Sequence, residues 1–83
     1  MQKNKQIKFT AEHVIIIEQF KKHAGQRLSS GDIQSLTNIE PVKVNLILFD
    51  LSSSGILDEI NLDEDSRVYM LTDHGRNFKS ENI

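Results

Sequence analysis

Hydrophobic and polar residues recur along this chain with two periods, which predict three helices followed by a two-stranded hairpin. Thr10 is a good N-cap for the first helix, because apolar residues follow it at helical spacing. Three basic side chains at 21–23 oppose the helix dipole in the last turn, and Gly25 can supply a left-handed cap. The apolar positions of this helix are Val14, Ile17, Phe20 and Ala24, with Ile15 and Ile16 beside them.

A short second helix is predicted over residues 31–36, after an extended link at 27–29. Either Ser29 or Ser30 can cap it, because a serine hydroxyl accepts a hydrogen bond from the first free backbone N–H groups. We expect two of its side chains to point inward, Ile33 and Leu36.

A third helix is predicted over about 41–54, after a turn at 37–40. Pro41 suits its first turn, where the missing N–H costs nothing, and Gly55 can end it. Apolar residues at helical spacing form its core stripe, which consists of Val44, Ile47, Leu48 and Leu51.

The last third of the chain has the pattern of a hairpin followed by a short helix. Residues 56–62 and 68–71 are suited to strands, and the polar cluster 63–66 between them is typical of a turn. Thr72 can cap a final helix, in which a residue without Cβ, Gly75, allows close approach to its neighbours.

Length and composition indicate one small folded domain, residues 10–83, preceded by a basic N-terminal arm, residues 1–9. The formal net charge of −2 gives phosphate binding no support. The chain has no Cys, which excludes disulfides and thiolate chemistry. Its longest apolar run, 14–17, is too short for a membrane span or a signal peptide, so we expect a cytoplasmic protein without a membrane partner.

Three segments together, 29–37, 44–57 and 69–76, resemble the winged helix-turn-helix domains of MarR-like and ArsR-like bacterial regulators. The resemblance covers roughly residues 10–80. It implies an α+β fold with a three-helix core, a two- to three-stranded wing and a short C-terminal helix. MarR-type regulators carry further helices that 83 residues cannot supply.

The resemblance also implies a small transcriptional regulator whose partner is double-stranded DNA. The third helix would then enter the major groove, and the hairpin 56–71 would contact the backbone or the minor groove as the wing. The side chains on these surfaces that suit phosphates or base edges are Gln34, Asn38, Lys43, Asn45 and Arg67.

Two features depart from that family pattern. Val42, Leu46 and Phe49 form a second apolar stripe, opposite the core stripe of the third helix. Either this helix packs on two sides, with Phe49 under the first helix or the arm, or the stripe is an interface with a protein partner or a second copy. The second possibility gives an alternative function, an interaction module that does not bind DNA.

The second departure is the acidic wing, where Arg67 opposes a group of carboxylates. This group either repels phosphates or is a solvated turn that discourages pairing of strand edges. Its members are Asp58, Glu59, Asp63, Glu64 and Asp65.

Neither catalytic nor metal-binding chemistry is predicted. His13, His23 and His74 lack the i, i+4 spacing that places two imidazoles on one helix face, so we expect surface or partly packed histidines. The acidic run lacks the glycine of a calcium loop, and Ser52-Ser53-Ser54 lacks the frame of a nucleophilic serine. We therefore expect no enzyme activity, cofactor or small-molecule substrate.

Overall fold

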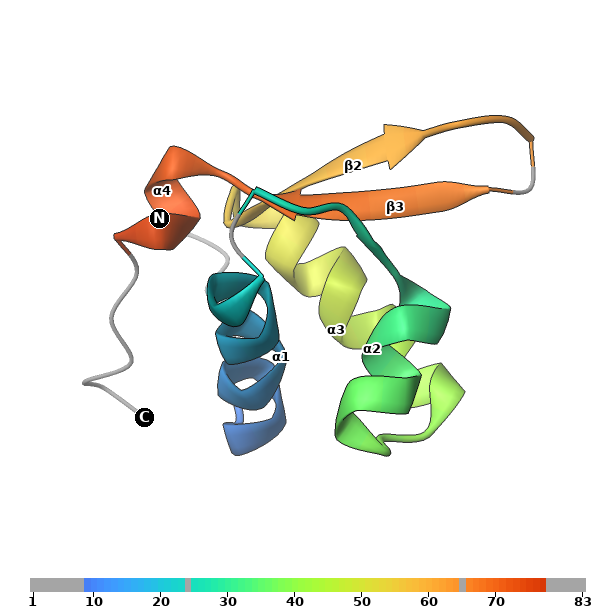
Figure 1. The fold of residues 1–83 in the computed structure, drawn as a ribbon. Helices are drawn as coiled ribbons and strands as arrows, with labels where there is room; N and C mark the ends of the chain where they lie inside the picture. The colour runs from blue at the N-terminus through green and yellow to red at the C-terminus, as the bar shows by residue number, and fades with distance from the viewer. Residues whose placement is uncertain (1–8, 24, 65, 78–83) are drawn as a thin grey trace, which may run out of the picture.

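The computed structural model describes residues 9–23, 25–64 and 66–77. These residues form helices on one side of a small antiparallel sheet (Figure 1). Their order is α1 (Ala11–Lys22), β1 (Leu28–Ser29), α2 (Ser30–Thr37), α3 (Pro41–Ser53), β2 (Leu57–Asn61), β3 (Arg67–Leu71) and α4 (Asp73–Arg76). This is the predicted α+β arrangement. The predicted arm lies outside the described residues apart from Phe9.

The sheet has the order β1-β3-β2, with β3 in the middle. Leu28 of β1 lies opposite Tyr69, and Leu57 of β2 lies opposite Leu71. The extended link predicted before α2 thus becomes a third, very short strand. The hairpin of β2 and β3 projects past α2, while α4 lies at the opposite end of β3 (Figure 1).

Helix starts follow the predicted capping chemistry. A hydroxyl caps α1, α2 and α4, and α3 begins instead with Pro41 in its first turn, without a side-chain cap. The three hydroxyls accept from the backbone N–H three residues later, at 3.4 Å for Thr10 and His13, 3.1 Å for Ser29 and Asp32, and 2.9 Å for Thr72 and Gly75.

The core lies between the helices and the sheet, and it corrects the predicted inward face of α1. The buried residues of α1 are His13, Ile16, Ile17 and Phe20, whereas Ile15 is 44% exposed. Val14 is half-buried, and Ala24 lies outside the described residues. Four consecutive β-branched residues at 14–17 fit several helix faces equally well, so the pattern alone did not fix the rotation of the helix.

Leu36 was also predicted to point inward, and this was wrong, since its side chain is 45% exposed. Thr37, one turn after Ile33, is half-buried, and its hydroxyl donates to the Ile33 carbonyl at 2.7 Å. The third helix follows its prediction, because Val44, Ile47, Leu48 and Leu51 are all buried. Among the described residues, no helix has the length and apolarity that crossing a membrane requires.

Candidate nucleic-acid interface

The face of α3 opposite its core stripe is exposed. Val42 and Phe49 are each 67% exposed, and Leu46 is 60% exposed. We call these three residues the apolar face. Phe49 is therefore not packed under α1, whereas residues 1–8 of the arm lie outside the described residues. A large exposed apolar side chain is common singly, but three on one helix face form a patch that is typical of an interaction site.

Lys43 lies beside the apolar face and points toward α1. Its Nζ lies 3.3 Å from Glu12 Oε1, and the two side chains are 53% and 37% exposed. An ion pair this exposed contributes only about 0–1 kcal/mol to the stability of the fold, because water screens the two charges. Lys43 can therefore exchange Glu12 for another anion at little cost.

Asn45 and Arg67 lie on the other side of α3, along one groove. Both line a groove of about 480 Å³ between the start of α2, the middle of α3 and the hairpin. Arg67 Nε lies 2.9 Å from Glu59 Oε2 on the neighbouring strand. A hydrogen bond with Tyr69, and then the Glu59 carboxylate, raise the pKa of Arg67 above its usual value, which keeps the guanidinium charged.

Gln34 and Asn38, the two other predicted site residues, do not line this groove. Asn38 ends α2 in the left-handed conformation, with φ +62°, and its N–H donates to the Gln34 carbonyl at 2.8 Å. Asparagine tolerates this conformation better than most residues. Asn38 thus has a structural role in the turn, whether or not its exposed side chain meets a ligand.

The surroundings of the groove are acidic. Asp58, Glu59, Asp63 and Glu64 are exposed on the hairpin, and Asp65 lies outside the described residues. Asp63 Oδ1 accepts the Ser66 N–H at 2.9 Å, so this carboxylate shapes the turn. At the start of α2, Asp32 accepts the Ser29 N–H at 3.0 Å. A carboxylate thus already occupies the helix end that lies beside the groove.

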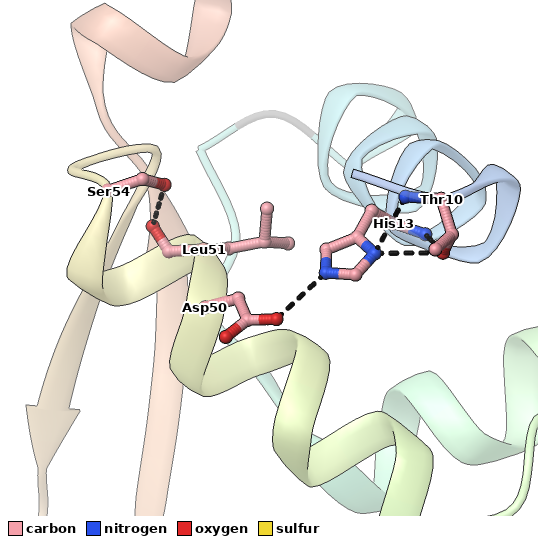
Figure 2. A network of polar contacts seen from close by, with 5 residues as sticks. All are labelled: Thr10, His13, Asp50, Leu51 and Ser54. Atoms are coloured by element: carbon pink, nitrogen blue, oxygen red, sulfur yellow. Dashed lines mark hydrogen bonds and ion pairs between the residues drawn. The ribbon is translucent and has the colours of Figure 1, made fainter. Parts of the chain in front are cut away.

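His13 makes a contact that sequence analysis missed, and its side chain is buried, not at the surface or partly packed. Figure 2 shows the imidazole between Thr10 and Asp50. The Thr10 N–H donates to Nδ1 at 3.1 Å, so we place the proton on Nε2, which donates to Asp50 Oδ2 at 3.0 Å. Phe9 stacks on the imidazole, with ring centroids 5.1 Å apart. The histidine after the capping threonine was a visible signal, whereas its partner lies 37 residues away.

This polar contact fixes α3 against α1. Within the described residues, no group of three His, Cys, Asp or Glu side chains is placed to hold a metal ion. The His13–Asp50 contact joins α1 to the helix that carries the apolar face, Lys43 and Asn45.

Comparison with known proteins identifies the fold. No protein-family model and no curated protein matches the chain. Among solved structures, it is similar to the ferric uptake regulator from Francisella tularensis, solved with iron, at 26% identity and a TM-score of 0.76. The match covers 88% of this chain and 59% of that protein. The similarity does not single out the MarR-like or ArsR-like type, and it shows that this chain has the winged-helix fold of a transcription regulator.

Proposed function

We propose that this protein is a transcriptional regulator that binds double-stranded DNA, with α3 in the major groove and the hairpin of β2 and β3 as the wing. The observation that carries the proposal is the groove beside the exposed face of α3 that both Asn45 and Arg67 line. The similarity to a winged-helix transcription regulator supports it. This function implies a cytoplasmic location and no enzymatic activity.

Each polar residue has a distinct role in this proposal. Lys43 leaves Glu12 and contacts a phosphate or a guanine, and the Asn45 amide reads a base edge. Arg67, which stays charged, reaches the backbone or a narrow minor groove. Gln34 and Asn38 lie on α2 and contact DNA at the edge of the same surface. Val42, Leu46 and Phe49 contact thymine methyl groups.

A fluorescence polarisation titration of the chain against a random-sequence duplex tests the proposal, at about 50 and 200 mM salt, a range over which phosphate contacts weaken strongly. We expect binding that is lost as salt rises. Lys22→Ala is the matched control for Lys43→Ala, because Lys22 is an exposed cation on α1, away from the groove. Absence of binding at the lower salt concentration would overturn the proposal.

A second function is favoured by one specific observation, the exposure of the apolar face. In this alternative the protein is an interaction module that uses α3 to bind protein and does not bind DNA. The acidic hairpin and the net charge of −2 agree with it. The two functions differ in what Lys43→Ala changes, since the loss of one cation weakens DNA binding but leaves apolar association largely intact.

A further inference from the structure

The apolar face has the spacing of a helix-packing seam. Val42, Leu46 and Phe49 are followed by Ser53, which is exposed at the end of α3, so the intervals are four, three and four residues. This is the alternation by which one helix packs along another in a coiled coil. The occupant that fits this face is therefore a second helix lying along α3.

Charges beside the seam indicate which helix it is. Lys43 and Asp50 lie seven residues apart on the same flank of α3, and the position on the opposite flank is the uncharged Asn45. In an antiparallel pair of helices, corresponding flanks face each other. Lys43 then lies opposite the partner's Asp50, and Asp50 lies opposite the partner's Lys43. A parallel pair would instead bring these charges against the uncharged flank.

We propose that a second copy of this chain covers the apolar face, with the two α3 helices antiparallel about a two-fold axis between Leu46 and Phe49. Leu46 then packs on the partner's Phe49, and Val42 lies opposite the partner's Ser53. The proposal rests on both proposed functions above: it takes from the second that the apolar face binds a protein, which it names, and from the first that α3 binds DNA. It adds that the dimer and DNA compete for α3, so the dimer is the DNA-free state.

Both flanking side chains are able to form these cross-pairs. Among the described residues, the ion pair given for Lys43 is the one with Glu12. An ion pair this exposed is weak, so Lys43 can exchange Glu12 for the partner's Asp50. The Asp50 carboxylate can accept hydrogen bonds from His13 and from a partner's lysine at the same time, since a carboxylate accepts several hydrogen bonds. Its side chain is 35% exposed.

The interface is small. The seam from Val42 to Ser53 is about 16 Å long, at 1.5 Å per residue. An interface of this size falls at the weak end, below about 1,200 Å². We therefore expect a monomer–dimer equilibrium that is visible only when concentration is varied, over about 1 μM to 1 mM.

Disulfide trapping tests the antiparallel register, because the chain has no cysteine of its own. We expect the double variant V42C/S53C to form a covalent dimer under mild oxidation, whereas V42C alone and S53C alone do not. In the antiparallel dimer each single cysteine lies about 16 Å from its copy, beyond the roughly 7 Å between Cα atoms that a disulfide spans. Cross-linking of both single variants would show a parallel pair and overturn the proposal.

Sedimentation equilibrium tests the dimer without any cross-link. We expect the average mass to rise with concentration in the wild type, and at least a tenfold weaker association in Leu46→Gln/Phe49→Gln. The matched control is Ile15→Gln, which removes another exposed apolar side chain, from α1, and should associate as the wild type does. A wild type that stays monomeric at every concentration would overturn the proposal, whatever else the face binds.

Duplex DNA separates this inference from the DNA-binding function. We expect the reduced V42C/S53C protein to bind DNA and its oxidised dimer not to bind. If the oxidised dimer forms and binds equally well, competition for α3 is wrong. If the dimer forms and neither state binds DNA, the dimer stands and the DNA-binding proposal fails.

Discussion

His13 Nε2 donates to Asp50 Oδ2 at 3.0 Å and thereby connects α1 to the helix that carries the candidate interface (Figure 2). His13 is 6% exposed, and its other ring nitrogen accepts from the Thr10 backbone. The same imidazole therefore closes the start of α1 and orients α3. Because His13 is buried, removing the Asp50 carboxylate leaves the Nε2–H of His13 without its acceptor inside the protein.

Asp50→Ala should lower the free energy of unfolding by about 1–3 kcal/mol, because Nε2–H of His13 loses its acceptor. Chemical denaturation measures this. Asp58→Ala on β2 removes an exposed carboxylate and should change stability by less than about 0.5 kcal/mol. If the two variants lost the same stability, His13 would not depend on Asp50.

Gly75→Ala should destabilise the protein by about 1–3 kcal/mol, because an added Cβ would overlap the Ile56 carbonyl oxygen and lie 2.9 Å from Leu71 Cδ1. Thermal unfolding followed by circular dichroism measures this. The matched control is Gly31→Ala in α2, where the nearest atom, Ser29 Oγ, would lie 3.7 Å away. Alanine favours helix there, so this control should be neutral or stabilising, and a loss as large as that of Gly75→Ala would contradict the packing.

Leu46→Gln/Phe49→Gln should leave the fold and its helix content intact, since both side chains are exposed. Each of these substitutions of an exposed side chain should change the free energy of unfolding by less than about 0.5 kcal/mol. Leu48→Ala, on the buried side of the same helix, should lower the free energy of unfolding by about 2–5 kcal/mol. Unfolding of the double variant would mean that the apolar face belongs to the core.

Two variants distinguish the DNA contacts of α3. Lys43→Ala should weaken binding to all sequences and reduce the salt slope by about 1, since one phosphate contact is lost. Asn45→Ala should relax the preference at one base pair, by about 1–3 kcal/mol. Competition titrations with a set of duplexes measure both effects. Unchanged binding in both variants would remove α3 from the DNA interface.

Local chemistry made most of the fold predictable. Thr10, Ser29, Pro41 and Thr72 mark the four helix starts, because capping depends on residues within one turn. The rotation of α1 about its axis was not predictable, since four consecutive β-branched residues do not show which face of the helix points to the core. The prediction for Leu36 failed for a related reason, because a short helix with Ile33 as its other apolar residue does not fix which face points inward.

The candidate site was only partly predictable. Its residue types and the apolar face on α3 follow from helical spacing, and the structure confirms that the face is exposed. The groove that Asn45 and Arg67 both line and the His13–Asp50 contact depend on tertiary packing between distant segments. No local pattern encodes the distance between residues 37 positions apart.

A nuclear magnetic resonance titration of the isotopically labelled chain with a short duplex, at low salt, tests directly whether α3 and the hairpin bind DNA. We expect backbone amide shifts to change along the exposed side of α3 and at Arg67 on β3, while those of Ile15 on the outer side of α1 stay unchanged. Shift changes confined to other elements, or none at all, would contradict the assignment of α3 and the wing as the DNA-binding surface.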